Sequence, residues 1–286
     1  MPGPELTSTR SARVQAVRRL AKRSFRAADR RFLAEGPQAV REALNHPDAP
    51  VEVFVTAETA TRFAELIEVA ERRGVPVHPV SGEVMVALAQ TVTPQGVAAV
   101  CRFVDTNLAD VLAGAPRLLA VLSHVRDPGN AGTVLRAADA AGADAVVLTD
   151  ACVDVYNPKC VRATAGSLFH LPVVLGVPLA ELAQAVRAAG LQVLAADAAA
   201  GEDLDTAADS GTLAGPTAWV FGNEAWGLPA EALACTDAAV RVPIHGAAES
   251  LNLATAAAVC LYASARAQRG PGGCRHGDAA TVTPRR

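Results

Sequence analysis

The 286-residue chain has few aromatic residues (4%) and contains no apolar run of about 18 residues free of charge, the length a membrane-spanning helix needs. Its N-terminal segment, MPGPELTSTRSARVQAVRR, has no apolar stretch of the kind that a secretory signal requires. We therefore expect a cytoplasmic protein without a membrane partner. A wholly disordered chain is also excluded, because 51% of the residues are hydrophobic and the net charge is only −3.

Metal-binding patterns are also lacking. The six cysteines and six histidines are scattered along the chain, and no Cys-x-x-Cys pair or Cys/His cluster has the spacing of zinc ligands. We expect no metal cofactor, and we expect most cysteines to be reduced core residues.

Positive charge is concentrated at the N-terminus. Residues 1–41 contain ten Lys or Arg residues and three acidic residues, so they carry +7 while the remaining chain carries −10. This asymmetry is typical of contact with a polyanion, and the dominance of Arg favours bidentate phosphate binding. The alternative is a solvated basic helix without a partner. The candidate phosphate contacts here are Arg18, Arg19, Lys22, Arg23, Arg26, Arg30 and Arg31.

The hydrophobic pattern predicts an α/β protein of two domains. Residues 1–104 form a small α/β module that begins with a basic helix over 12–30, and 105–116 form a linker. In 117–268, short apolar runs alternate with helices, which predicts a mostly parallel sheet covered on both faces. The Gly-, Pro- and Arg-rich residues 269–286 are expected to be a disordered tail. The predicted strands of the second domain are 118–125, 144–150, 171–176, 191–197, 217–222 and 239–244.

Three loops at the carboxyl ends of these strands have unusual composition, and ligands of open α/β sheets bind there. The first, RDPGNAG (126–132), opens a helix with Asn130 as a possible cap. Arg136 lies about 240° further around the same helix, so the two side chains do not share a face. An ordinary cap and a surface arginine are the alternative. The glycine spacing differs from G-x-G-x-x-G, which argues against a dinucleotide-dependent oxidoreductase.

The second loop, FGNEAWGLP (221–229), places Gly222 where a ligand could approach the backbone and Glu224 at the mouth. A solvent-facing glutamate is the alternative there. In the third, VPIHGAAESLNL (242–253), we expect Ser250 to cap a helix starting at Leu251 and Asn252 to present its amide to a ligand. Capping alone is the alternative for Ser250.

Together these segments resemble the SPOUT superfamily, specifically the TrmH/SpoU-type RNA 2′-O-ribose methyltransferases. Asn130 and Arg136 match the first family motif, and Gly222, Glu224 and Gly227 match the second. The third is matched by Val242, Pro243, Ser250, Leu251 and Asn252. The segment 157–174 resembles a fourth, with Arg162 as its basic residue.

The resemblance implies a C-terminal trefoil-knotted parallel-sheet domain that binds S-adenosylmethionine and forms a homodimer. It also implies a preceding ribosomal-protein-like domain that binds RNA, with ribosomal RNA expected over transfer RNA. The implied catalytic residues are Asn130, Arg136, Glu224, Ser250 and Asn252. The implied cofactor contacts are Leu194, Ala195, Ala196, Gly222, Val242 and Leu251. A non-catalytic RNA-binding protein of the same fold is the alternative.

Because a guanidinium keeps its proton under nearly all protein conditions, Arg136 is a poor general base. Our hypothesis is that it binds the phosphate of the target nucleotide and stabilises the developing alkoxide. Asn130, Ser250 and Asn252 would then fix the orientation of the target nucleotide. Glu224 would hold Arg136 or contact the ribose.

Overall fold

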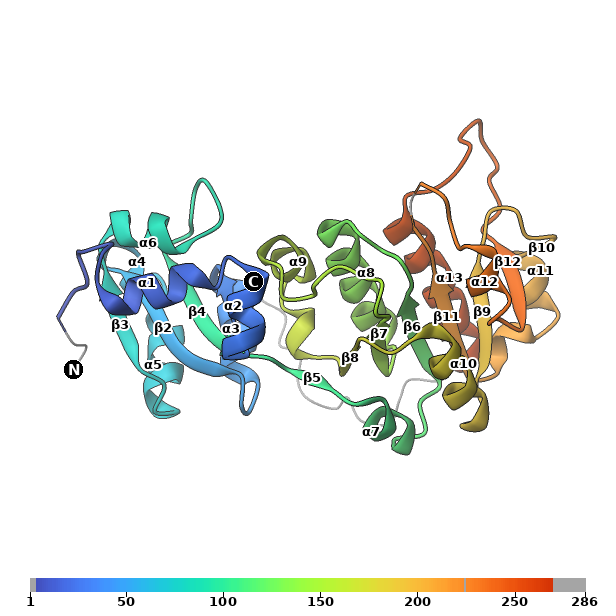
Figure 1. The fold of residues 1–286 in the computed structure, drawn as a ribbon, viewed down its shortest axis with the longest axis horizontal. Helices are drawn as coiled ribbons and strands as arrows, with labels where there is room; N and C mark the ends of the chain where they lie inside the picture. Colours follow the sequence, from blue (N-terminus) through green and yellow to red (C-terminus); the bar gives the residue numbers. More distant parts are fainter. Residues whose placement is uncertain (1–3, 224, 270–286) are drawn as a thin grey trace, which may run out of the picture.

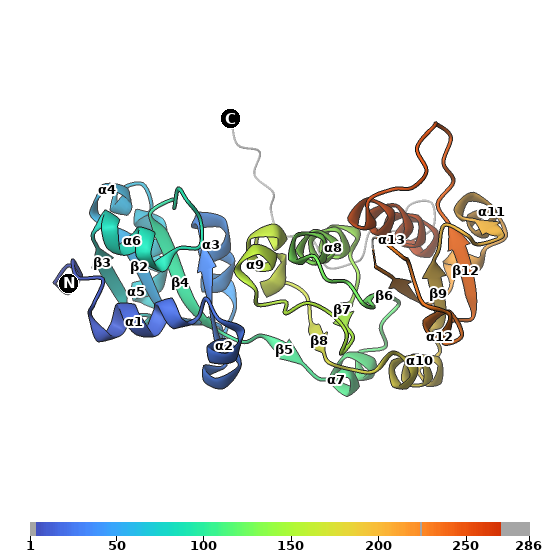
Figure 2. The ribbon, with the colours of Figure 1, turned by 45° about the horizontal axis from the view of Figure 1, so that its top comes forward.

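The computed structural model describes residues 4–223 and 225–269, which form two α/β domains arranged side by side (Figures 1 and 2). The N-terminal domain contains a four-stranded sheet of order β1-β4-β2-β3. Strand β4 pairs antiparallel with β1 and β2, and β3 pairs parallel with β2. The strands are β1 (Arg31–Glu35), β2 (Pro50–Thr56), β3 (Val77–Val80) and β4 (Val97–Arg102). The helices are α1 (Ala12–Arg19), α2 (Arg23–Asp29), α3 (Pro37–Asn45), α4 (Ala57–Ala60), α5 (Ala64–Arg72) and α6 (Gly82–Leu88).

The predicted basic helix over 12–30 is two helices, because the chain turns at residues 20–22 between α1 and α2. The guanidinium Nη1 of Arg26 donates to the carbonyls of Leu20 and Ala21, at 2.8 Å each. These carbonyls follow the end of α1, where backbone acceptors lack helical partners. The prediction of a single helix was therefore wrong. Arg26 of α2 stabilises the turn between the two helices.

The C-terminal domain is built on an eight-stranded sheet of order β10-β12-β9-β11-β6-β7-β8-β5. All neighbouring strands are parallel, as predicted. The strands are β5 (Asp105–Thr106), β6 (Leu118–Leu122), β7 (Ala145–Leu148), β8 (Val173–Leu175), β9 (Gln192–Ala196), β10 (Glu202–Asp203), β11 (Thr217–Phe221) and β12 (Ala238–Arg241). The helices are α7 (Leu108–Ala113), α8 (Pro128–Ala141), α9 (Pro158–Thr164), α10 (Leu179–Ala188), α11 (Leu204–Asp209), α12 (Ala230–Leu233) and α13 (Leu253–Arg269), with short 3-10 turns η1 (Ser167–Phe169) and η2 (Thr212–Ala214).

Both faces of this sheet are buried, which explains the uninterrupted apolar strands. In β6, Leu118, Ala120 and Leu122 belong to the same hydrophobic cluster as buried residues of α8 and α13. The alternate residues Leu119 and Val121 pack with buried residues of α10 instead. A parallel strand covered on both faces has no polar side, so the period-2 alternation of a half-exposed strand is missing.

The two domains share one continuous core. Phe32 of β1 lies 4.8 Å from the ring of Tyr156, which stacks on Phe103 at a centroid distance of 3.7 Å. The Tyr156 hydroxyl accepts hydrogen bonds from the backbone amides of Val104 and Asp105, and donates one to Asp105 Oδ1 at 2.7 Å. Burial raises the pKa of Tyr156, so the phenol stays protonated and can donate. The predicted linker 105–116 thus begins at a fixed point, and its β5 and α7 add to the C-terminal domain.

The remaining sequence predictions concern the cysteines, membrane spans and the C-terminal tail. The five described cysteines carry free thiols, and burial raises the pKa of Cys160 and Cys260 to about 12. Within the described ranges, no helix is long and apolar enough to cross a lipid bilayer. Helix α13 continues through Arg269, and the remainder of the predicted tail, 270–286, lies outside the described residues.

Candidate functional site

The three loops singled out from the sequence meet at the carboxyl ends of neighbouring strands. Strands β6, β9 and β11 are adjacent and parallel, and β12 lies beside β9. The first loop leads from β6 into α8, the second follows β11, and the third joins β12 to α13. The sheet therefore places segments far apart in the sequence along one edge, as expected for ligand sites of open α/β sheets.

Asp127, rather than Asn130, caps helix α8. Its Oδ1 accepts a hydrogen bond from the backbone amide of Asn130 at 2.8 Å, and Pro128 occupies the first helical turn. Lys159 Nζ lies 2.7 Å from Asp127 Oδ2. The hydrogen bond from Lys159 and the bond from the Asn130 amide lower the pKa of Asp127, so the cap stays ionised. The capping role therefore falls to Asp127 and not to the side chain of Asn130.

Asn130 and Asn252 meet although 122 residues separate them. Asn252 Nδ2 donates a hydrogen bond to Asn130 Oδ1 at 3.1 Å. Asn252 Oδ1 accepts from the backbone amide of Ala254 at 2.9 Å, so the orientation of the Asn252 amide is set at the start of α13. The helix begins at Leu253, two residues later than predicted. Asn252 therefore performs the capping that was expected of Ser250, and the predicted convergence of the first and third loops is observed.

Arg136 is an exposed residue of α8 that lies two turns beyond the helix start. Within residues 4–223 and 225–269, no hydrogen bond or ion pair engages its guanidinium. It does not line the cavity described below. Its catalytic role stays a prediction. Glu224, the predicted carboxylate of the second loop, lies outside the described residues.

A cavity of about 680 Å³ opens beside the convergence of the loops. That volume lies within the usual range of about 300–1,000 Å³ for small-molecule sites. It is lined by four of the expected cofactor contacts, Ala196, Gly222, Val242 and Leu251, and by Ser250, which was expected to be catalytic; these roles stay predictions. The lining also includes five residues that were not predicted from the sequence: Asp197, Asn223, Trp226, Ile244 and Glu249. Of these, Trp226 could have been predicted from the sequence, since it is an aromatic residue next to a loop glycine in an aromatic-poor chain.

Two predicted cofactor contacts lie elsewhere. Leu194 and Ala195 precede Ala196 in β9, and both side chains are buried, on opposite faces of the sheet. Neither lines the cavity. The reason is positional, because only the last residue of the strand reaches the carboxyl edge where the loops begin.

The second loop is held tightly at its base. A Cβ added at Gly222 would lie 2.5 Å from the backbone of Gly227, so the close approach of these two residues requires glycine. The backbones of Asn223 and Gly227 also exchange two hydrogen bonds of 2.9 Å. Gly227 has a φ of 68°, in the left-handed region that favours glycine. The two glycines of the motif therefore close the loop on itself at the wall of the cavity.

The predicted RNA-contact residues divide into two groups. Arg18, Arg19, Lys22, Arg23 and Arg31 are exposed around α1, α2 and the start of β1. We call these five residues the basic surface. They remain candidates for phosphate contact.

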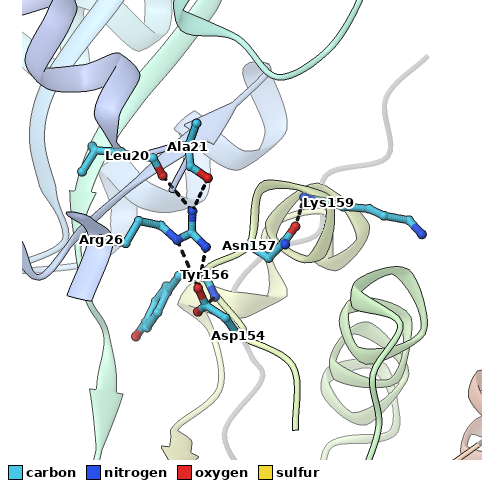
Figure 3. Close-up of polar contacts among 7 residues, drawn as sticks. All are labelled: Leu20, Ala21, Arg26, Asp154, Tyr156, Asn157 and Lys159. Atoms are coloured by element: carbon cyan, nitrogen blue, oxygen red, sulfur yellow. Dashed lines mark hydrogen bonds and ion pairs between the residues drawn. The ribbon is translucent and has the colours of Figure 1, made fainter. Parts of the chain in front are cut away.

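Arg26 was predicted wrongly as an RNA contact. It is 2% exposed, and its Nη2 lies 2.5 Å from Asp154 Oδ2 of the C-terminal domain (Figure 3). Charge alone could not reveal this role, because the partner carboxylate is 128 residues away in the sequence.

Arg30 and Arg162 also contact the junction between the domains. Arg30 lies over the Phe103 ring and pairs with Asp105 at 3.0 Å. Arg162 pairs with the nearly buried Glu35 of β1 at 3.3 Å. The structure therefore assigns Arg162, and part of Arg30, to domain packing rather than to a free phosphate-binding surface.

His170 is a further link between the domains, and no pattern in the sequence indicates it. Its Nδ1 lies 2.8 Å from Asp139 of α8, and its Nε2 lies 3.2 Å from Glu42 of α3. Burial lowers the pKa of His170, but hydrogen bonds with the two carboxylates outweigh burial and raise the pKa above its usual value.

No candidate metal site is found in the described part of the chain, where no group of three or more His, Cys, Asp or Glu side chains could hold an ion.

Two family models match the chain, one for each domain. Residues 117–262 match the model described as the SpoU rRNA methylase family, and residues 11–99 match an MRM3-like substrate binding domain. Each match falls within one of the two domains of the fold.

Curated relatives match along nearly their whole length. A 23S rRNA guanosine 2′-O-methyltransferase of Bacillus subtilis is 35% identical over 258 residues, which cover 90% of this chain and 98% of the relative. A 23S rRNA guanosine 2′-O-methyltransferase of Bordetella pertussis is 34% identical over 244 residues, covering 82% and 97%.

Solved structures of methyltransferases also resemble the fold of this chain along nearly their whole length. An AdoMet-bound rRNA methyltransferase from Sinorhizobium meliloti has a TM-score of 0.78 and 31% identity, covering 91% of this chain and 97% of that one. The SpoU methyltransferase AviRb from Streptomyces viridochromogenes, in complex with AdoMet, has a TM-score of 0.77 and 28% identity, covering 89% and 98%.

Proposed function

The chain belongs to the SpoU rRNA methylase family, and from this premise we propose that it transfers a methyl group from S-adenosylmethionine to a ribose 2′-hydroxyl of ribosomal RNA. The observation that carries the proposal is the hydrogen bond between Asn130 and Asn252, which joins two family motifs beside the cavity. The names of the relatives favour ribosomal RNA over transfer RNA. The expected compartment is the cytoplasm, where that substrate is found.

The cavity fits S-adenosylmethionine. Its walls combine apolar side chains, Val242, Leu251 and Leu253, with polar groups from Asn223 and Ser250. The tight turn at Gly222 leaves backbone close to the cavity, as an adenine or a methionine moiety would need. When bound, S-adenosylmethionine supplies an electrophilic methyl group on a sulfonium. Two relatives with this fold have been solved with AdoMet bound, which supports the same cofactor here.

Residues of the three loops and Arg136 of α8 would orient the ribose and stabilise charge. Asn130 and Asn252 hold each other in a fixed orientation, so the pair would help to position the ribose. Ser250 is exposed on the cavity wall and can contact the ribose. Arg136 remains cationic and would bind the target phosphate and favour the alkoxide that forms as the hydroxyl loses its proton. Glu224 keeps its proposed role of holding Arg136 or contacting the ribose.

The basic surface would bind the RNA backbone at a distance from the reaction centre. Its five residues are exposed, and they belong to the domain that matches a substrate-binding model. Phosphate contacts carry little sequence information, so they would fix the register of the RNA.

The C-terminal domain would dimerise and would carry a trefoil knot. Helix α13 exposes Val259 (39%) and Tyr262 (52%), large apolar side chains three residues apart and hence on one face. Strand β12 is the last strand in the sequence, and β9 and β11 separate it from β6 in the sheet. The chain then returns, and α13 packs against α8. This path supports the threading that the family resemblance implies. Size-exclusion chromatography with light scattering should give a dimer that Tyr262→Glu converts to monomer.

Methyl transfer provides the direct test. The protein would be incubated with methyl-labelled S-adenosylmethionine and either unmodified 23S ribosomal RNA or a transfer RNA pool. The labelled ribose would then be mapped. We expect labelling of one ribose in the ribosomal RNA. Labelling of transfer RNA alone would contradict the substrate, and labelling of neither by a protein that binds both ligands would favour the non-catalytic alternative.

A further inference from the structure

Trp226 is a strongly exposed aromatic side chain at the rim of the cavity. It is 51% exposed, although the chain has only two tryptophans and the other, Trp219, is fully buried. Trp226 lines the cavity together with Ile244 and Leu251, which are each 37% exposed. A half-exposed indole leaves a large apolar face in water, which a solvated loop does not need.

The loop that carries Trp226 is held by a set of hydrogen bonds. The backbone bridge between Asn223 and Gly227 closes the turn, and Asn223 Oδ1 accepts from the backbone amide of Ala225 at 2.9 Å. Asn223 Nδ2 donates to the carbonyl oxygen of His124 at 3.1 Å, which joins this loop to the first loop. The indole is therefore presented from a closed turn that is tied to a neighbouring element.

His124 lies against the indole. Its ring centroid is 5.5 Å from that of Trp226, with an angle of 71° between the ring planes. Its φ of 60° lies in the left-handed region, which a residue with a side chain adopts at a cost. Its Nδ1 lies 3.0 Å from Oγ of the buried Ser123. The surrounding structure thus holds His124 in a strained conformation whose ring contacts the exposed tryptophan.

The position of Trp226 favours the substrate side of the cavity. Its aromatic neighbour His124 belongs to the loop between β6 and α8, which leads to Asn130 and its partner Asn252. The residues 196–199 also line the cavity, but they follow β9, which lies on the other side of β11 from β6. A fixed and exposed ring is suited to stacking on a planar base, because every nucleobase offers a π-face.

We propose that Trp226 stacks on the base of the nucleotide whose ribose is methylated, and that His124 positions the indole for this contact. The inference rests on the proposed function and deepens it. It adds a contact with a base to a protein whose other RNA contacts are expected to be with phosphates and the target ribose. Stacking tolerates any base, so Trp226 would hold the target nucleotide without selecting its identity.

Substitution of Trp226 separates this role from a contact with the cofactor. Trp226→Ala, Trp226→Phe and the remote exposed control Val92→Ala would be compared for the Kd of S-adenosylmethionine and for kcat/KM with unmodified 23S ribosomal RNA. We expect Trp226→Ala to lower kcat/KM by about tenfold or more, since the effects of removing a stacked ring span roughly 5- to 150-fold. The Kd of the cofactor should stay within about twofold. Trp226→Phe should retain most activity, and Val92→Ala all of it.

Tryptophan fluorescence supplies a readout that does not depend on catalysis. The emission of Trp226 is isolated by subtracting the spectrum of Trp226→Phe, which keeps the buried Trp219. Unmodified 23S ribosomal RNA should protect this emission from acrylamide, while saturating S-adenosylmethionine alone should not. If the wild-type chain failed to methylate RNA, the proposed function would fail, and protection by RNA would still test the stacking contact.

Two results would overturn the inference. Protection by the cofactor alone, with weaker cofactor binding in Trp226→Ala, would assign the indole to the cofactor. Unchanged kinetics and no protection by RNA would leave it without a ligand role. The positioning role of His124 is tested by a double-mutant cycle. His124→Ala should lower kcat/KM in the wild-type background and cause no further decrease when Trp226 is already alanine.

Discussion

Arg26 and Asp154 form a nearly buried ion pair that joins the two domains, with side-chain exposures of 3% and 13%. The same guanidinium also satisfies the carbonyls of Leu20 and Ala21. Asp154 in turn accepts a hydrogen bond from the backbone amide of Tyr156 at 2.9 Å. One side chain therefore stabilises both the turn between α1 and α2 and the contact between the domains.

Replacing Arg26 should destabilise the protein strongly. Arg26→Ala would leave a carboxylate and two carbonyls without their partner, and breaking a buried pair costs about 3–5 kcal/mol. Urea unfolding followed by circular dichroism would measure the decrease in stability. Arg23→Ala, which removes an exposed arginine of the same helix, is the matched control and should change the free energy of unfolding by less than about 0.5 kcal/mol. Equal effects of both substitutions would contradict the assignment.

The basic surface should behave in the opposite way. Combined alanine substitution of Arg18, Arg19, Lys22 and Arg23 should leave folding largely unchanged and weaken the binding of ribosomal RNA. Removing each side chain that binds a phosphate should reduce the slope of log K against log salt by about 0.7–0.9. Filter binding at several salt concentrations provides the measurement. A variant with the wild-type slope would show that these residues do not bind phosphate.

Asn252→Asp should separate capping from catalysis. The aspartate keeps an oxygen that can accept from the amide of Ala254, so α13 retains its cap. It replaces the Nδ2 donor with an oxygen that faces Asn130 Oδ1, which breaks the bond between the two motifs. We expect kcat to fall about 10²-fold, as when one preorganised hydrogen-bond donor is removed, with little change in melting temperature. Normal methyl transfer by this variant would exclude a role for the pair.

Arg136→Ala should lower kcat by about 10²–10³-fold if the guanidinium stabilises the developing alkoxide. Cofactor binding should be unaffected, because Arg136 does not line the cavity. Arg136→Lys keeps the charge but loses the planar fork, so it should recover part of the activity. Full activity of the alanine variant, with normal cofactor binding, would refute the assignment.

His170 should make the domain contact sensitive to pH. Its pKa is raised in the folded protein, so its contribution to stability is complete below the unfolded pKa of about 6.5 and disappears as the pH rises through the folded pKa. The side chain is 41% exposed, so solvent screening limits the effect to less than about 1 kcal/mol. Melting temperatures of wild type and His170→Gln should differ most below about pH 6.5 and converge once the pH has risen above the folded pKa. A constant difference across this range would argue against titration of His170.

The sequence was most informative where local chemistry decides the structure. The apolar runs predicted the parallel sheet, and the loops after β6, β11 and β12 were identified from their composition. The meeting of Asn130 and Asn252 was predicted from family motifs, since no local pattern links residues 122 positions apart.

The errors concern side chains whose roles depend on distant partners or on details of local geometry that composition does not give. Arg26 was grouped with exposed arginines because its carboxylate partner belongs to the other domain. Ser250 was expected to cap a helix that begins two residues later, where Asn252 competes for the same role. Trp226 was overlooked because the exposure of a single aromatic residue depends on how its loop closes, and the bonds of Asn223 and His124 decide that.

The hydroxyl of Tyr156 holds the start of the linker, and the rings of Phe32 and Phe103 close around it. Because the two domains cannot hinge freely at this point, the span from the basic surface to the cavity has a set length. The enzyme would then select its target by distance. A ribose would be methylated only if it lies at the correct separation from the stretch of RNA that is bound to the basic surface. Loosening that joint should broaden the set of methylated positions before it abolishes methylation.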